Sequence, residues 1–374
     1  MRRLFIVVAA CCQLSAALAQ TQRVEVLDFL PAPGQFVNVL PAVAEGATQA
    51  EANRACEEQL NGGGLVSLGA FGGYVVVRFD HPVENLRGSD ILVLGNGYYA
   101  SPGSLGGSIE PGIVCVGVGD DHRTAKWYEL AGSEFHTSQV RNFEITYFKP
   151  EAESGPHSQS YSSFDEYVRW ECSWTDADGA RRDSAGFHPK NTFHSQSYWP
   201  LWAEGDALTF RGGRLPNNAV ELSGNGSRWV QYRYAADAYG YADACAAADS
   251  LFSSFDIDWA VDDDGEPVRL ERVDFIRVST AIFQHCGWIG ETSTEIRSIA
   301  DLHLVEGYDA NPFVVPTRPK PDTSLRPVVA PPAEASGAFY ALTGQRVGRP
   351  VPGRLYVRGG KLVVCKNSLS SQDK

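Results

Sequence analysis

The alternation of hydrophobic and polar positions is clearest between residues 64 and 96. Leu65–Leu68 predicts a short strand, Tyr74–Asp80 a second and Ile91–Leu94 a third, with Pro82 ending the second. One face of the second strand carries Val75, Val77 and Phe79, and the other carries Tyr74, Val76 and Arg78. Because apolar side chains occur on both faces, we expect this strand to be covered on both sides and central in its sheet.

Similar strands recur along the chain with turn residues between them. The clearest are Arg23–Leu30, Gln35–Leu40, Ile113–Val118, Phe143–Phe148, Tyr167–Trp174, Arg228–Tyr234, Phe255–Val261 and Asp274–Thr280. Asp176–Gly179 and Asp262–Gly265 have the Asp-Gly chemistry of hairpin turns. Thr48 and Glu51 form a capping-box pattern before the one good helix, Ala50–Leu60. The pattern predicts an all-β fold, an antiparallel β-sandwich of jelly-roll type with one or two short helices.

The two ends of the chain differ from this β-rich middle. Met1–Ala19 has the charged start, apolar core and small-residue cleavage site of a signal peptide. Val8–Cys11 also resembles a lipobox, so a lipoprotein is the alternative. Seven prolines between Asn311 and Pro332 predict a stiff, extended spacer. We therefore predict a signal peptide over 1–19, a β-sandwich surface domain over 20–309, a Pro-rich linker over 310–336 and a small C-terminal β-module over 337–374.

Composition supports an exported β-protein with an acidic surface. Aromatic residues make up 11% of the chain and glycine occurs 37 times, which suits many strands joined by tight turns. The formal charge of −13 argues against nucleic acid or an anionic membrane as a partner. Six cysteines remain after removal of the leader: Cys56, Cys115, Cys172, Cys245, Cys286 and Cys365. They are expected either to form disulfides or to be free buried thiols, since their spacing shows no CxxC metal pattern.

Eight short blocks in order carry a resemblance to a known family: Pro33–Asn38, Leu68–Gly73, Phe79–Pro82, Glu110–Gly112, Trp127–Ser133, Phe193–Tyr198, Phe255–Ala260 and Gly290–Glu295. Over Arg23–Leu304 the chain resembles uncharacterised cell-surface proteins of Bacteroidetes, often described as cell surface proteins or as carrying PKD domains. Such proteins commonly have an Asp/Asn/Gly-rich loop before the WYEL motif. This chain has only Asp120–Arg123 there, so no metal role is expected for that loop.

The tail carries a second resemblance. Tyr340–Val347, Gly353–Val357 and Lys361–Val364 resemble the C-terminal sorting or anchoring modules of Bacteroidetes surface proteins. The resemblance implies export through the outer membrane and display at the cell surface, with transport or secretion machinery as a partner.

The densest aromatic stretch, Phe193–Trp202, is the candidate binding site. Its candidate ligand-binding residues are His194, Gln196, Tyr198, Trp199 and Trp202. Aromatic rings on a rigid β-surface stack on sugars or apolar cofactors, although the same rings could fill the core. We expect Trp199 and Trp202 to divide, one pointing inward and the other lying at a surface cleft with Tyr198 and His194.

An acidic group near residue 260 is the candidate for a structural calcium. Asp256 and Asp258 are two apart on a predicted strand and should share a face, and Asp262 and Asp264 follow in a turn. Oxygen ligands of this kind suit calcium, whereas turn chemistry alone is the alternative.

The sequence offers no convincing catalytic centre. The pentapeptide HSQSY occurs at 157–161 and 194–198, but neither serine has a nucleophile elbow or an orienting acid. The leading hypothesis is a non-enzymatic surface module that captures a glycan or another small nutrient, with a corrinoid among the candidates. Two alternatives remain: a structural or adhesive protein, and a glycan-degrading enzyme that uses Asp256, Asp258 or Glu291.

Overall fold

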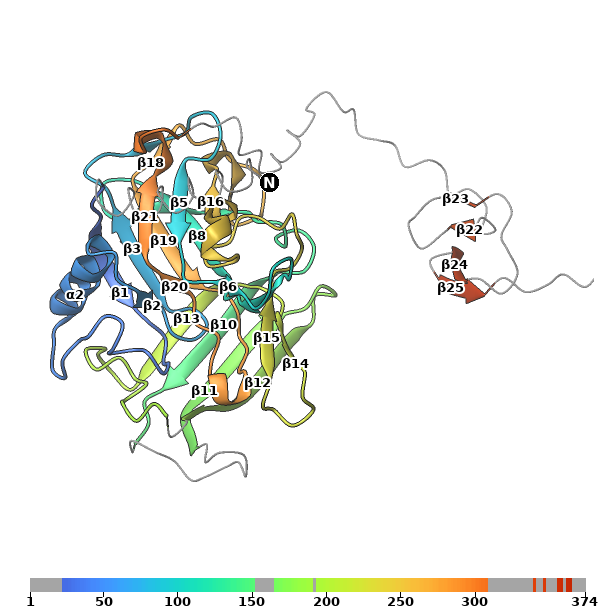
Figure 1. The fold of residues 1–374 in the computed structure, drawn as a ribbon, viewed down its shortest axis with the longest axis horizontal. Helices are drawn as coiled ribbons and strands as arrows, with labels where there is room; N and C mark the ends of the chain where they lie inside the picture. The colour runs from blue at the N-terminus through green and yellow to red at the C-terminus, as the bar shows by residue number, and fades with distance from the viewer. Residues whose placement is uncertain are drawn as a thin grey trace, which may run out of the picture. The chain divides into compact units, whose positions relative to one another are not determined.

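The computed structural model describes residues 22–151, 165–190 and 193–308, together with four short strands of the tail (Figure 1). The predicted signal peptide (1–19), the Pro-rich linker (310–336), the HSQSY copy at 157–161 and Cys365 lie outside the described residues. The chain divides into two compact units, Met1–Pro316 and Thr317–Lys374.

The predicted helix is α2, Gln49–Asn61. Both hydrogen bonds of the capping box are present: the Glu51 backbone N–H donates to Thr48 Oγ1 at 3.3 Å, and the Thr48 backbone N–H donates to the Glu51 carboxylate at 2.8 Å. The buried positions Ala52, Cys56 and Leu60 are four residues apart and so share one face of the helix. In Figure 1 the helix lies beside the first strand, β1 (Glu25–Leu30).

The largest sheet has six strands in the order β1, β3 (Tyr74–Arg78), β19 (Phe275–Thr280), β8 (Gly112–Val118), β9 (Lys126–Leu130) and β17 (Ala260–Val261). We call it the central sheet. β3 pairs with β1 on one side and with β19 on the other, as its two apolar faces predicted. Its Val75 and Val77 are completely buried.

The remaining strands of the first unit form smaller sheets. One four-stranded sheet contains β12 (Arg181–Lys190), β11 (Asp165–Thr175), β10 (Val140–Phe148) and β13 (Ala207–Arg214). A second contains β14 (Ala219–Glu221), β15 (Trp229–Tyr232), β7 (Gly106–Ser108) and β6 (Tyr98–Tyr99). A three-stranded sheet contains β16 (Ser254–Phe255), β5 (Ile91–Leu94) and β21 (Ser298–Asp301). Two-stranded pairs join β18 (Arg272–Val273) to β4 (Val83–Glu84) and β2 (Val66–Ser67) to β20 (Glu295–Ile296).

The second unit contains one sheet in the order β23 (Arg346–Val347), β22 (Phe339–Tyr340), β24 (Leu355–Arg358) and β25 (Lys361–Val364). All strand pairs are antiparallel, which confirms the predicted all-β antiparallel fold. The strands are divided among more than the two sheets of a simple sandwich.

The two largest hydrophobic clusters pack around the central sheet. The larger cluster joins one face of that sheet, through residues such as Val77 and Val116, to α2 and the β5 sheet. The second joins Phe71 to residues of the β10–β13 sheet such as Phe143 and Phe210. The central sheet is thus covered on both faces, and the cleft described below lies on its second face.

Several local predictions need correction. Gln35–Leu40 forms turns and no strand. Phe255–Val261 is interrupted by the 3₁₀ helix η2 (Ile257–Trp259), because the Asp256 carboxylate accepts the Asp258 backbone N–H at 2.9 Å and caps it. The cysteines need no correction: the five described ones are all free and buried, which is the second of the two expected alternatives.

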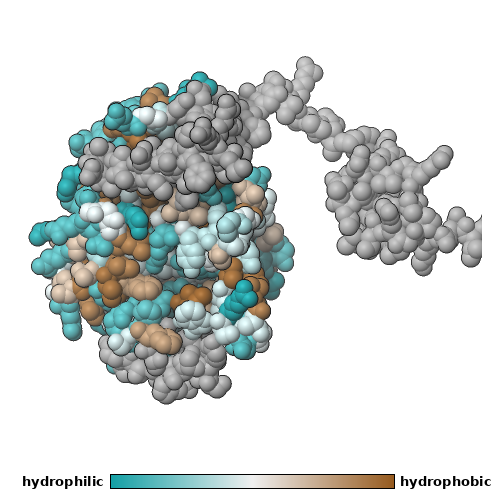
Figure 2. Space-filling model, in the orientation of Figure 1, coloured by the Kyte–Doolittle hydropathy of each residue, from teal (hydrophilic) through white to brown (hydrophobic). Residues whose placement is uncertain are grey.

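The surface is mixed in polarity. On the face drawn in Figure 2, hydrophobic residues form separate patches among hydrophilic ones. Among the described residues, no helix is both long and apolar enough to cross a membrane.

Candidate functional site

A row of side chains crosses the second face of the central sheet. The strand register places Asp28 (β1) opposite Val76 (β3), Val76 opposite Arg277 (β19), Arg277 opposite Cys115 (β8) and Cys115 opposite Glu129 (β9). Residues that are register partners in neighbouring strands have side chains on the same face. The pairing therefore brings one arginine, one thiol and two carboxylic acids from four strands onto one surface, with Val76 of β3 between Asp28 and Arg277; we call these five residues the polar row.

The polar row forms the floor of a cleft of about 320 Å³. Strand β13 forms one wall with Thr209–Gly213, and Phe71 and Gly72 contribute further lining. His122, Arg123 and Trp127 also line the cleft. A volume of this size lies at the lower end of the roughly 300–1,000 Å³ found for small-molecule sites.

Arg277 is the central charged group of the floor. One guanidinium nitrogen donates to Cys115 Sγ at 3.6 Å, and the guanidinium carbon lies 5.1 Å from the centre of the Trp127 ring. In the described part of the chain no carboxylate forms an ion pair with Arg277. Burial raises the pKa of the Cys115 thiol, so this partner is a neutral thiol and does not cancel the positive charge.

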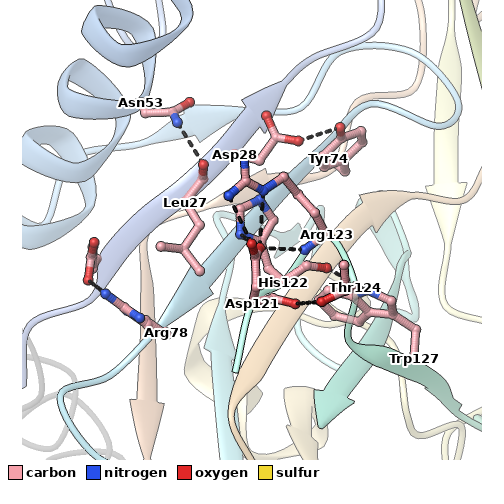
Figure 3. Close-up of polar contacts among 11 residues, drawn as sticks. Leu27, Asp28, Asn53, Tyr74, Arg78, Asp121, His122, Arg123, Thr124 and Trp127 are labelled. Carbon is pink, nitrogen blue, oxygen red and sulfur yellow. Dashed lines mark hydrogen bonds and ion pairs between the residues drawn. The ribbon is translucent and has the colours of Figure 1, made fainter. Parts of the chain in front are cut away.

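The other two cleft-lining arginines are neutralised from outside the cleft. Arg123 forms an ion pair with Asp121 at 2.8 Å, and Arg211 forms one with Glu144. Both arginine side chains are 75% exposed, so these pairs are worth little in stability. Figure 3 shows the Asp121–Arg123 contacts beside Trp127.

The two carboxylic acids of the cleft differ in environment. Asp28 accepts a hydrogen bond from the Tyr74 hydroxyl at 2.7 Å (Figure 3). Glu129 accepts one from Gln139 Nε2 at 2.7 Å, and burial raises the pKa of Glu129 to about 7. Glu129 therefore changes its charge near neutral pH, two strands away from Arg277 on the same face.

Trp127 is fixed in place by its own loop. Its indole N–H donates to the His122 backbone carbonyl at 3.1 Å, and its ring centre lies 6.3 Å from that of Phe275. A ring held at several points presents a preorganised surface at small cost in side-chain entropy.

The predicted aromatic site is placed differently from our expectation. Trp199 and Trp202 are 2% and 5% exposed, and Tyr198 is 1% exposed. Trp202 stacks on Phe29 in the larger core cluster, with ring centres 5.6 Å apart. The expectation that one indole lies at a surface cleft is wrong. Trp202 packs in the larger cluster on one side of the central sheet, and Trp199 packs in the second cluster on the other side.

The polar members of that stretch make local contacts away from the polar row. His194 packs edge-on against Phe36 with ring centres 4.9 Å apart. The Gln196 amide donates to the Gln35 carbonyl. Neither residue lines the cleft.

The four candidate calcium ligands do not form a metal site. Asp256 caps η2, whereas Asp258 is exposed and accepts a hydrogen bond from Asn85 at 3.0 Å. Asp262 accepts the Asp264 and Glu266 backbone N–H groups at 3.0 and 2.9 Å, which is turn chemistry. Within the described residues no group of three or more His, Cys, Asp or Glu side chains is arranged to hold a metal ion.

A second group of carboxylic acids is enclosed in the interior. Glu110 accepts from Gln231 Nε2 at 2.8 Å, and Asp243 accepts from the backbone N–H of Gly97 at 3.0 Å. Burial raises the pKa of Glu110, of Asp243 and of the neighbouring Glu295, the last to about 7. All three are at most 8% exposed, and Glu295 accepts a hydrogen bond from Asn96 Nδ2, so each of these buried acids has a polar partner.

No protein-family model matches this chain, and no curated protein matches it. The fold and the site thus define the class: an all-β protein with a polar cleft on the second face of its central sheet. Sequence reasoning missed Arg277, Cys115 and Glu129 as site residues. A usable signal was present, since Arg277 is a charged residue inside a strand whose neighbours Ile276 and Val278 are apolar.

Proposed function

We propose that this protein is an exported, surface-displayed binding module that captures a glycan or another small nutrient in the cleft above the polar row. The single observation that carries the proposal is the cleft itself. It combines a fixed tryptophan, an arginine that has no ion pair among the described residues and several hydrogen-bonding side chains in about 320 Å³. Export and display rest on the leader and the tail, as expectations from the sequence.

The lining suits reversible recognition of a polar ligand. Aromatic side chains such as Trp127, Tyr74 and Phe210 supply apolar surface, and Asp28, Glu129 and Arg277 supply hydrogen-bonding groups. Polar residues make up about half of the lining, which suits a polar, hydrogen-bonding ligand better than an apolar one. A corrinoid remains among the ligands to test.

The separation of the carboxylic acids favours binding over hydrolysis. Asp28 and Glu129 are four strand positions apart in the central sheet, which at about 4.8 Å per strand is roughly 19 Å. Glycosidases hold their two carboxyl groups about 5–10 Å apart. Among the residues considered for an enzyme, Glu291 is 3% exposed and accepts the Gln35 backbone N–H at 2.6 Å.

Blocking the cleft tests the proposal. Gly212 lines the cleft, and a Cβ atom there would meet no other atom within 4 Å, so Gly212→Phe fills space without a backbone clash. Ala207 is exposed on the same strand and does not line the cleft, which makes Ala207→Phe the matched control. The full chain is screened against neutral and acidic oligosaccharides and cyanocobalamin.

We expect the unmodified chain and Ala207→Phe to bind the same ligand, and Gly212→Phe to lose at least tenfold in affinity. Equal binding by both variants would place the site elsewhere. An absence of binding by the unmodified chain would favour the structural or adhesive alternative.

A further inference from the structure

The floor of the cleft carries a positive charge that no acidic side chain of the described residues neutralises by an ion pair. Three arginines line the cleft, and two of them pair with Asp121 and Glu144, which lie outside its lining. Arg277 alone contacts a thiol and an aromatic ring. This charge, which has no ion-pair partner in the described part of the chain, occurs in a protein whose formal net charge is −13.

The surroundings of Arg277 leave hydrogen-bond donors for a ligand. A guanidinium has five N–H donors around its edge and none on its faces. The Trp127 ring lies against the guanidinium by a cation–π contact, and Cys115 accepts from one nitrogen. The remaining donors are then available for a planar acceptor, which the arginine fork binds through two parallel hydrogen bonds.

The two carboxylic acids of the polar row favour an acceptor with a single negative charge. Asp28 lies two strands from Arg277 on one side, and Glu129 lies two strands away on the other. Their carboxyl groups would repel a phosphate dianion more strongly than a carboxylate. One free guanidinium also balances a single negative charge.

We propose that the cleft recognises an acidic sugar of one or two rings, whose carboxylate binds Arg277. This inference rests on the proposed function, since it names the ligand class of the same cleft. The small volume limits the ligand to a few rings, and Tyr74, Phe210 and Trp127 provide apolar surface near the charge.

The test compares an acidic disaccharide with its neutral counterpart, and with inorganic phosphate as a second anion. The full chain is titrated calorimetrically with a uronic-acid-containing disaccharide, with the neutral disaccharide of the same linkage and with inorganic phosphate. We expect the acidic disaccharide to bind at least tenfold more tightly than the neutral one. Arg277→Gln should make the two affinities equal. Arg277→Lys should keep part of the preference for the acidic disaccharide, because the positive charge remains without the planar guanidinium.

Two further variants keep the test decisive. Arg182→Gln removes an exposed arginine that pairs with Asp176 outside the cleft, and it should leave the ratio unchanged. Glu129→Gln keeps Arg277 and should raise the affinity for the acidic disaccharide, so it tests the same subsite if Arg277→Gln fails to fold.

Equal affinity for both disaccharides, with no effect of Arg277→Gln, would overturn the acidic-ligand inference and leave the proposed function standing. Tighter binding of phosphate than of the acidic disaccharide would also overturn it. If neither disaccharide nor any ligand of the wider panel binds, both proposals fail together.

Discussion

At the scale of single residues, Glu129 is a group in the cleft whose charge changes near neutral pH. A glutamate in water has a pKa of about 4.3, and burial raises that of Glu129 to about 7. Below pH 7 the side chain is therefore mainly neutral, and above it mainly ionised. The charged or titratable groups that act on it are Arg277, Arg141, Cys115 and Tyr241.

This pKa predicts how the affinity for an anionic ligand depends on pH. As the pH rises through about 7, Glu129 ionises near Arg277 and competes with the ligand for its charge, so the affinity should fall by about three- to tenfold between pH 6 and 8. Calorimetric titration across this range measures the change. Glu129→Gln should flatten the profile. Because His122 also lines the cleft, the comparison is repeated with His122→Gln, and a slope that survives Glu129→Gln but disappears with His122→Gln would assign the effect to the histidine.

Stability should follow the same titration. Folding raises the pKa of this carboxyl group, so its ionisation lowers the free energy of unfolding. The loss of stability is complete above about pH 7 and absent below about pH 4. The neutral Glu129→Gln variant is consequently expected to be more stable than the parent at pH 8 and similar to it at pH 4.

At the scale of elements, the segment 193–202 between β12 and β13 stabilises both sides of the central sheet. Trp199 belongs to the cluster with the β10–β13 sheet, and Trp202 belongs to the larger cluster with Phe29 of β1. A connecting segment with no regular structure thus contributes a large buried ring to each cluster. Its density of aromatic residues reflects packing on two sides.

Truncation of these rings should destabilise the first unit. Trp199→Ala and Trp202→Ala are each expected to lower the free energy of unfolding by about 3–5 kcal/mol, because each leaves a large cavity. Phe193 is 68% exposed in the same segment, and Phe193→Ala is the control with a small expected effect. Denaturant unfolding followed by circular dichroism measures all three. A loss below about 1 kcal/mol for either tryptophan would contradict its assignment to the core.

At the scale of the whole molecule, the cleft proposed for binding and the tail proposed for sorting belong to different units. The central sheet, both main clusters and the cleft belong to the first unit. The second unit contains its own four-stranded sheet. A unit with its own core folds independently in most proteins.

Removal of residues 317–374 should therefore leave the melting temperature of the remaining protein within about 2 °C of the full chain. Surface labelling of cells that produce the truncated protein should decrease strongly if the tail directs display. Early melting of the truncated protein would show that the first unit depends on the tail. Normal surface labelling of the truncated protein would contradict the proposed sorting role of the tail.

The sequence alone determined those features that depend on neighbours along the chain. The alternation in Tyr74–Arg78 predicted a strand covered on both faces, and the Thr48–Glu51 pair predicted where α2 begins. Side-chain alternation and helix capping are local, acting over two to four residues, so a single sequence contains them in full. The Asp256 cap was missed because an aspartate in an apolar stretch fits a strand edge and a helix start equally well.

The tertiary structure alone decided which residues form the cleft. Asp28, Cys115, Glu129 and Arg277 lie in four different strands far apart in sequence, and only the pairing order β1–β3–β19–β8–β9 places them on one face. Likewise, the sequence named Trp199 and Trp202 as notable rings, but burial depended on which elements packed around them. Strand register is fixed by contacts between distant segments, and a shift of one residue would turn every side chain of a strand to the opposite face. The composition of the site is therefore a property of the assembled sheet.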